Sequence, residues 1–189
     1  MMAVRPEEHP PPAGELAVQV VPMRRRHLRS VLRIEAQVYP RPWTLGLFLS
    51  ELNLHVSRSY FVARVDGQVV GYGGLMLSME DAHITTLAID PEWQRRKLGQ
   101  RLMVVLTREA VRRGSKNLTL EVRVSNLAAQ GLYRRFGLAP AGIRKGYYVE
   151  SGEDAIVMWA HGIDDLAYSD RLHRLWDDVP GTTLVEHPR

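Results

Sequence analysis

Segments with alternating polar and hydrophobic residues and segments with helical spacing follow one another along this chain. Leu16 to Val21 alternates as a half-buried strand does. Residues 24 to 37 carry hydrophobic residues at helical spacing, namely Leu28, Val31, Leu32 and Ile34. Thr44 can begin a second short helix through Leu54, because its hydroxyl can accept a hydrogen bond from an unpaired backbone N–H. The pattern therefore predicts two helices before the main run of strands.

The middle of the chain predicts a hairpin and then a strand–helix–strand unit. Tyr60 to Val65 and Gln68 to Leu77 flank an Asp66-Gly67 dipeptide, which is a strong hairpin signal. A strand over 82–89, a helix over about 98–113 and a strand over 117–124 follow. The hairpin requires antiparallel pairing, whereas the unit after it favours a parallel pair.

The remaining elements complete a mixed α/β fold in a single domain. A helix over 126–136 precedes strands over 143–149 and 155–160, and spaced apolar residues mark a short accessory helix: Leu166, Leu172, Leu175 and Trp176. We predict a central, mostly antiparallel twisted sheet that contains a parallel strand–helix–strand unit and is flanked by helices. Residues 1–15 are a Pro-rich disordered arm, 16–161 the main domain, and 162–189 the accessory helix with a loose last ten residues.

Composition limits the chemistry. The 189 residues suit one domain, and no apolar run approaches the ~20 residues that span a bilayer. Glu7, Glu8 and three prolines stand where a signal peptide would be apolar, so we expect a soluble cytoplasmic protein without a membrane partner. The chain has no cysteine, and its seven histidines are scattered, so we predict no thiolate nucleophile and no metal. No assembly motif occurs, and we expect a monomer.

An arginine cluster stands early in the chain, where the net charge of +4 concentrates: Arg24, Arg25, Arg26, Arg29 and Arg33. Such a cluster is usually a solvated helix face, and we expect no direct contact with nucleic acid. Attraction to an acidic partner such as ribosomal RNA or an acidic peptide is the minor alternative.

A basic loop connects a strand to a helix over residues 87–100. The first N–H groups of a helix lack intrahelical partners and the helix dipole favours anions, so Arg95, Arg96 and Lys97 suit a diphosphate. Gly99 allows close approach of the backbone to a ligand or a neighbouring strand. An ordinary connection with basic surface residues explains the loop equally well. Neither an ATP-binding P-loop nor a dinucleotide-binding glycine motif is present.

A carboxylate lies within a later strand. Leu118, Leu120, Val122 and Val124 share one face by their period of two, which places Glu121 on the other face with Thr119 and Arg123. Glu121 alone is more simply explained as a surface group paired with Arg123 or a cross-strand base, and Tyr133 alone can be an aromatic residue at the edge of the core.

Together these segments resemble the GNAT superfamily of N-acetyltransferases, and more narrowly the bacterial ribosomal-protein-alanine N-acetyltransferases. The resemblance covers about residues 17–161. It depends on Leu-Ala-Ile-Asp-Pro at 87–91, the loop at 94–99, Leu-Glu-Val-Arg-Val-Ser-Asn at 120–126, Leu-Tyr at 132–133, Lys-Gly-Tyr-Tyr at 145–148 and Glu-Asp-Ala-Ile-Val-Met at 153–158.

The resemblance implies acetyl-CoA as cosubstrate and assigns roles by position. Glu121 corresponds to the general base and Tyr133 to the general acid. Backbone groups of Leu87, Ala88 and Ile89 would meet the pantetheine arm, and Asn126 would contact the cofactor. The loop would hold the pyrophosphate through Gln94, Arg95, Arg96, Lys97, Leu98, Gly99 and Gln100. Trp43 and Tyr148 are candidate substrate contacts, for which simple packing is an equal alternative.

Lys97 departs from the family pattern, which usually has glycine there as the first glycine of the loop. We expect Lys97 to adopt ordinary helical dihedrals and to aim its ammonium at phosphate. The alternative is that its side chain crowds the site and weakens cofactor binding.

The resemblance leads us to predict acetyl transfer to the N-terminal α-amine of a protein, with an alanine-starting ribosomal protein as acceptor. Two alternatives remain open at this point. One is a GNAT enzyme that acetylates lysine or a small amine, and the other is a non-catalytic module that binds CoA or the ribosome.

Overall fold

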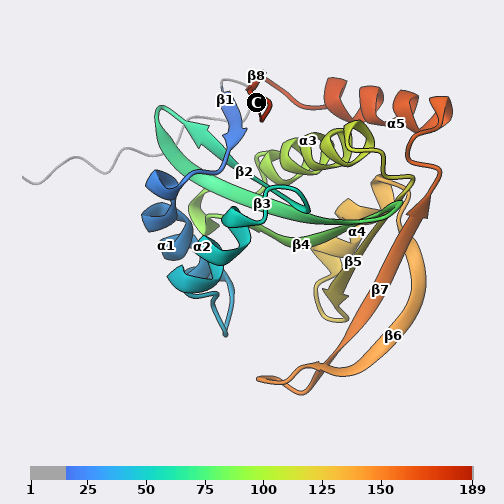
Figure 1. The fold of residues 1–189 in the computed structure, drawn as a ribbon, viewed down its shortest axis with the longest axis horizontal. Coiled ribbons are helices and arrows are strands. Elements are labelled where there is room, and N and C mark those ends of the chain that lie inside the picture. Colours follow the sequence, from blue (N-terminus) through green and yellow to red (C-terminus); the bar gives the residue numbers. More distant parts are fainter. Residues whose placement is uncertain (1–15, 189) are drawn as a thin grey trace, which may run out of the picture.

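One eight-stranded sheet forms the centre of the computed structural model, which describes residues 16–188 (Figure 1). The strand order is β6-β7-β5-β4-β3-β2-β1-β8. Neighbouring strands are antiparallel except for the pairs β4–β5 and β1–β8. The strands are β1 (Ala17–Pro22), β2 (Arg58–Val65), β3 (Gln68–Ser78), β4 (Asp81–Ile89), β5 (Asn117–Arg123), β6 (Ala139–Tyr148), β7 (Glu153–His161) and β8 (Thr182–Val185). The predicted mixed, mostly antiparallel sheet is confirmed.

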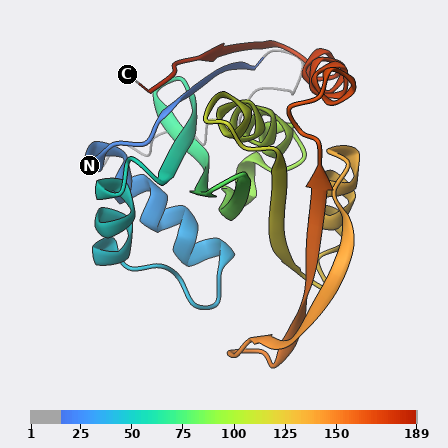
Figure 2. The same cartoon turned by 45° about the vertical axis from the view of Figure 1, so that its right-hand side comes forward.

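Helices cover both faces of this sheet and enclose two hydrophobic clusters (Figures 1 and 2). On one face, α1 (Leu28–Val38) and α2 (Leu45–Asn53) form the smaller cluster with β2 and β3. On the other face, α3 (Leu98–Arg112), α4 (Leu127–Arg135) and α5 (Leu166–Asp177) contribute to the larger one. This layering follows from the amphipathic spacing of each helix, whose apolar side packs against the sheet or, for α5, against α3.

Local signals in the sequence produce the expected turns and helix starts. Asp66 and Gly67 have φ values of 48° and 82°, the left-handed conformation that a tight two-residue hairpin turn requires. The Thr44 side chain accepts a hydrogen bond from the Leu47 backbone N–H at 3.2 Å and caps α2. These two predictions depended on local chemistry alone, and both are confirmed.

The parallel strands β4 and β5 pair over only a short stretch and then separate. Asp81, Ala82 and His83 are in register with residues 117–119, whereas β4 continues to Ile89 and β5 to Arg123. Beyond His83 each strand therefore has an edge that faces the other strand without a ladder of hydrogen bonds. Such edges leave backbone N–H and C=O groups for another partner.

Two boundaries differ from the sequence prediction. The strand expected to begin near residue 143 begins at Ala139, where Ala139 pairs with Trp159. The last ten residues were expected to be loose, and this is wrong for Thr182–Val185, which form β8 beside β1. Parallel pairing with an edge strand supplies the order that these residues lack as an isolated sequence. The predicted disordered arm, residues 1–15, lies outside the described residues.

Candidate active site

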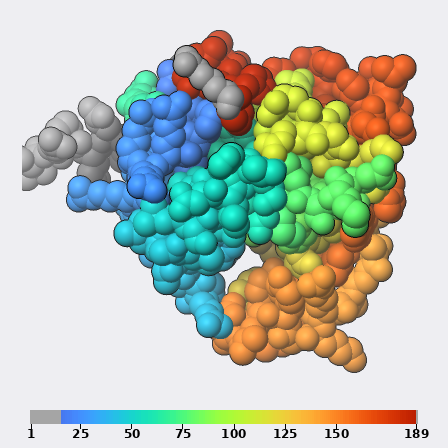
Figure 3. Space-filling view, in the orientation of Figure 1, coloured from blue at the N-terminus to red at the C-terminus, as the bar shows by residue number. Residues whose placement is uncertain are grey.

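A cleft of about 520 Å³ opens where β4 and β5 separate. Its walls come from the α1–α2 connection, β4, β5, α4 and the β6–β7 hairpin. The space-filling view shows the hollow between the light-blue α1–α2 segment and the orange hairpin (Figure 3). Six of the predicted site residues line it: Trp43, Leu87, Glu121, Asn126, Tyr133 and Tyr148.

Glu121 lies on β5 in this cleft, with its side chain 8% exposed. One carboxylate oxygen is 2.5 Å from His83 Nε2, and the other is 3.3 Å from Arg144 Nη2. The hydrogen bond from His83 lowers the pKa of Glu121, and the charges of His83 and Arg144 act in the same direction, against partial burial. Glu121 is therefore held as a carboxylate that faces the cleft.

Neither His83 nor Arg144 was expected from the sequence as a partner of Glu121. His83 stands one strand away on β4, at the last register pair before β4 and β5 separate. Its Nδ1 is buried and has no hydrogen-bond partner among residues 16–188, so the hydrogen bond to Glu121 is what orients the ring. The one available signal was the place of His83 at the start of the strand that precedes the basic loop, and seven scattered histidines obscured it.

Tyr133 and Asn126 reach the cleft from α4. The Tyr133 side chain is buried, and burial raises the pKa of its hydroxyl above the ordinary value. The Asn126 side chain caps the helix by accepting a hydrogen bond from the Ala129 N–H at 3.1 Å. α4 thus presents a phenol that stays protonated at any physiological pH.

A second carboxylate, Glu35 on α1, lines the opposite wall. It is 2% exposed, and its Oε1 accepts a hydrogen bond from the Trp43 N–H at 2.9 Å, while Oε2 has no partner among the described residues. Burial raises the pKa of Glu35 to about 7, and the Trp43 N–H opposes this only in part. The Trp43 ring packs against Phe48 with centroids 5.3 Å apart, so this residue serves both the packing and the cleft.

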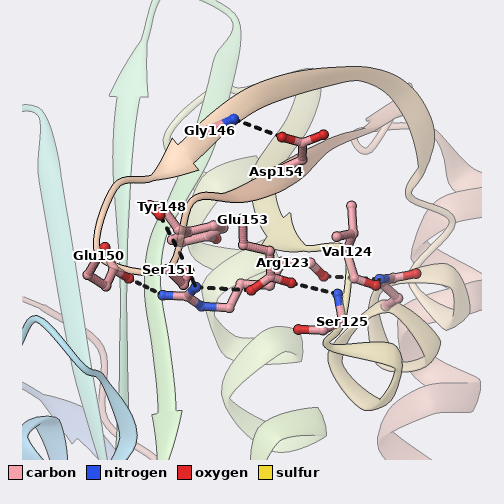
Figure 4. A network of polar contacts seen from close by, with 10 residues as sticks. Arg123, Val124, Ser125, Gly146, Tyr148, Glu150, Ser151, Glu153 and Asp154 are labelled. Atoms are coloured by element: carbon pink, nitrogen blue, oxygen red, sulfur yellow. Dashed lines mark hydrogen bonds and ion pairs between the residues drawn. The ribbon is translucent and has the colours of Figure 1, made fainter.

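The β6–β7 hairpin closes the far side of the cleft and is tied to β5 through Arg123 (Figure 4). The Arg123 guanidinium lies 3.8 Å from the centre of the Tyr148 ring and donates to Ser151 at 2.9 Å and to Glu153 at 3.1 Å. It also bonds to Glu150. Tyr148 is therefore held in the cleft wall by a cation–π contact.

The backbone edge predicted at 87–89 is present, and one of its carbonyl groups already accepts a hydrogen bond from within the protein. Leu87, Ala88 and Ile89 pair with β3 on one side and have no β5 partner on the other. The Tyr39 hydroxyl donates to the Leu87 carbonyl at 3.0 Å, a contact that was not predicted from the sequence. The edge is therefore placed to meet a polar arm that enters between the two strands.

The basic loop, residues 94–100, has a backbone that differs from our prediction for Lys97. Lys97 has φ 60° and ψ 13°, so it is left-handed and not helical, and Arg95 has φ 60° as well. The expectation of ordinary helical dihedrals is wrong. The chain here follows the conformation that glycine adopts most readily, so Lys97 keeps the loop geometry although it carries a side chain.

The side chains of this loop point in several directions. Arg96 stacks over Trp93 at 5.6 Å, and Gln94 Nε2 lies 3.5 Å from the Ile89 carbonyl. Leu98 is buried in the core, so only its backbone faces the loop. A Cβ on Gly99 would lie 3.4 Å from the Leu132 side chain, so Gly99 packs beside α4.

Lys97 and Gln100 are bonded to the C-terminal segment. Lys97 Nζ lies 2.8 Å from Asp178 Oδ2, and Gln100 Nε2 donates to the Leu175 carbonyl at 2.5 Å. The Lys97 ammonium therefore points at a carboxylate of this chain, and its contact with phosphate stays a prediction.

The loop still fits a diphosphate. α3 begins within it at Leu98, so the first N–H groups of that helix face the loop, and Arg95 is exposed beside them. Two left-handed residues spaced by one also resemble the backbone concavities that bind anions. Within residues 16–188, no cluster of three His, Asp or Glu side chains that could hold a metal ion occurs.

Known proteins match this fold and this arrangement. The Acetyltransferase (GNAT) family profile matches residues 28–138. A Bacillus subtilis protein with the provisional name of ribosomal protein bS18-alanine N-acetyltransferase is 43% identical over 137 residues, which cover 72% of this chain and 91% of that protein. The crystal structure of the Escherichia coli ribosomal-protein-S18-alanine N-acetyltransferase superposes with a TM-score of 0.70 at 30% identity, covering 77% of this chain and 94% of that one.

A third match concerns the cofactor. A Salmonella typhimurium protein solved with its cofactor acetyl-CoA shares the fold, with a TM-score of 0.67, 18% identity, and coverage of 79% of this chain and 95% of that one. No helix among residues 16–188 has the length and apolar character needed to cross a membrane. The profile match spans more than half of the chain, and the cleft, the separated strands and the basic loop agree with it. This chain is an N-acetyltransferase and belongs to the GNAT family.

Proposed function

We propose that this enzyme transfers the acetyl group of acetyl-CoA to the N-terminal α-amine of a protein, and that its acceptor is a ribosomal protein beginning with alanine. The observation that carries the proposal is the pair Glu121 and Tyr133, a carboxylate and a protonated phenol that line one cleft where two parallel strands separate. The names of the Bacillus subtilis and Escherichia coli relatives support the choice of acceptor.

The cleft can hold the reactants in a single line. The free edge of β4 suits the amide groups of a pantetheine arm, and the loop at 94–100 suits the diphosphate at the end of that arm. The α1–α2 connection and the β6–β7 hairpin form the open side, where Trp43 and Tyr148 would flank an incoming peptide. The thioester would then lie between the cofactor edge and the peptide entrance.

The proposed reaction is direct attack, since the chain has no cysteine to form an acyl-enzyme. The amine nitrogen bonds to the acetyl carbon, and the carbon–sulfur bond breaks. Glu121, directly or through a water, takes the proton that the amine loses, and Tyr133 gives its phenolic proton to the departing thiolate. Holding Glu121 ionised through His83 and Arg144 keeps the base available, although its lowered pKa limits its strength.

Proton affinity favours an α-amine over a lysine side chain. The ordinary pKa of an α-ammonium is near ~8 and that of a lysine side chain is near ~10.4, so deprotonating the terminus is easier by roughly 3.3 kcal/mol. At neutral pH a weak carboxylate base can deprotonate an α-ammonium far more readily than a lysine ammonium.

Mass spectrometry of two peptides tests the proposal. One peptide begins with a free alanine, and the other has a blocked terminus and one lysine; each is incubated with acetyl-CoA and the enzyme. We expect a gain of one acetyl group on the free alanine peptide alone. Acetylation only at lysine would assign the enzyme to side-chain or small-amine acceptors. Binding of acetyl-CoA without transfer to either peptide or to a polyamine would indicate a non-catalytic module.

A further inference from the structure

α5 packs on α3, and the segment after α5 continues into the edge strand β8. Asp178 ends α5, and the chain then runs through Pro180 and Gly181 into β8. We call residues 178–185 the C-terminal strap. Figures 1 and 2 show α5 on the same side of the sheet as α3, and β8 at the edge of the sheet beside β1.

A buried arginine fixes the strap in place. Arg101 on α3 is fully buried, and its guanidinium donates to the Thr182 carbonyl at 3.3 Å, to the Pro180 carbonyl and to the Thr183 hydroxyl. The Thr182 N–H donates to the Leu16 carbonyl at 3.0 Å. The first turn of α3 and the strap are therefore held in one fixed arrangement.

This arrangement delivers one carboxylate to the basic loop. Asp178 Oδ2 lies 2.8 Å from Lys97 Nζ, 2.5 Å from Arg135 Nη2 and 3.4 Å from Gln100 Nε2. These hydrogen bonds lower the pKa of Asp178, with the one from Lys97 contributing most. Asp178 is thus charged throughout the physiological range.

Lys97 needs such an anchor because of its backbone. A residue with a Cβ at φ 60° is in the left-handed region, which glycine enters without cost and other residues enter rarely. Non-glycine residues remain there only where their surroundings hold them. Among residues 16–188, the ammonium of Lys97 forms its ion pair with Asp178.

We infer that Asp178 is a positioning residue for the cofactor. It holds Lys97 in the left-handed conformation that shapes the diphosphate loop, a conformation that glycine would adopt without a partner. The inference depends on the proposed role of that loop in holding the diphosphate. If so, the C-terminal strap contributes to the cofactor site, although Asp178 lies 81 residues along the chain from Lys97.

A double-mutant cycle read by calorimetry with CoA tests this role. We expect Asp178→Ala to raise the Kd for CoA about fivefold, the scale of a half-exposed ionic network. Lys97→Gly supplies the second background of the cycle, because glycine keeps the left-handed backbone without the ion pair to Asp178. In the Lys97→Gly background, Asp178→Ala should then have almost no effect.

The matched control is Glu80→Ala, which removes the exposed ion pair between Glu80 and Lys116 at the other end of α3. It should not change the Kd. A second readout is turnover with acetyl-pantetheine, which lacks the diphosphate. Asp178→Ala should leave kcat/KM for that substrate unchanged, whereas general damage to the fold would lower it.

Three results would overturn the inference. Tighter CoA binding by Asp178→Ala would mean that Asp178 competes with phosphate for Lys97 and Arg135. If Asp178→Ala weakened CoA binding equally in the wild-type and Lys97→Gly backgrounds, Asp178 would act through the stability of the fold. If Asp178→Ala lowered kcat/KM equally for acetyl-CoA and for acetyl-pantetheine, the conclusion would be the same. Failure of the wild-type enzyme to bind CoA would instead refute the proposed cofactor site itself.

Discussion

The two ends of the active site are built in different ways. At the catalytic end, Glu121 and its partner His83 stand on adjacent parallel strands, and both side chains are largely shielded from solvent. At the loop end, Lys97 and Asp178 are 36% and 48% exposed and come from segments far apart in the sequence. A buried hydrogen bond between neighbouring strands holds one end, and an exposed ionic network holds the other.

This difference predicts where the site tolerates change. A partly buried, charge-assisted hydrogen bond is strong and its loss leaves a buried group unsatisfied. An exposed ion pair contributes little by itself and weakens in salt. We therefore expect loss of Glu121 at the catalytic end to alter the chemistry by a large factor, and substitutions at the loop end to alter affinity by small ones.

Glu121→Gln is expected to have the largest effect. Removing the proton acceptor should lower turnover by about 10²-fold or more, while the Kd for acetyl-CoA stays nearly unchanged. Steady-state kinetics and calorimetry on the same preparation separate the two quantities. Unchanged turnover would remove Glu121 from the role of base and make the catalytic end as tolerant as the loop end.

Tyr133→Phe should have a smaller effect, about 10-fold on turnover. A thiol has an ordinary pKa near ~8.5, so a thiolate can depart in part without receiving a proton in the same step. Stopped-flow measurement of thiol release would check this value. A loss as large as that of Glu121→Gln would mean that Tyr133 also places the acceptor.

His83→Ala should shift a pH profile more than it reduces the maximal rate. His83 lowers the pKa of Glu121, so its removal should raise that pKa toward the ordinary value and move the acidic limb of the kcat/KM profile to higher pH. We expect a turnover loss of about threefold at neutral pH. Arg144→Gln, which removes the more distant partner, is the matched comparison and should move the limb less.

Glu35→Gln should change the dependence of stability on pH. The carboxyl has a pKa of about 7 when folded and an ordinary value of 4.5, so the folded state binds more protons between these values. The wild-type free energy of unfolding should therefore fall as pH rises from about 4.5 to 7, and then level off. Relative to Glu35→Gln the difference should be about 3 kcal/mol, measured by urea denaturation at several pH values. Parallel curves for the two proteins would contradict it.

Much of this molecule could be predicted from the sequence because the signals are local. Thr44, with its hydroxyl next to a helix start, and Asp66-Gly67, with its left-handed turn, each carry their geometry within a few residues. The alternation in β5 placed Glu121 on the face away from the core residues Leu120 and Val122, and the structure agrees.

The contacts that complete the site could not be predicted in this way. His83 and Arg144 approach Glu121 from other strands, and nothing near them in the sequence marks that approach. Glu35 looked like any acid on an amphipathic helix until the fold buried it behind Trp43. Burial and long-range pairing change the chemistry of a carboxyl group, and neither is a local property.

The sequence by itself determined the order of the elements and the mixed sheet, since periodicity and local motifs specify these, whereas the roles proposed for Glu121 and Tyr133 came from the family resemblance. Only the tertiary structure decided that Lys97 is left-handed and paired with Asp178, and that Thr182–Val185 are ordered. The physical reason is the same in each case. A residue that is unfavourable in isolation, a lysine at positive φ or a short terminal strand, becomes stable when a distant segment satisfies it.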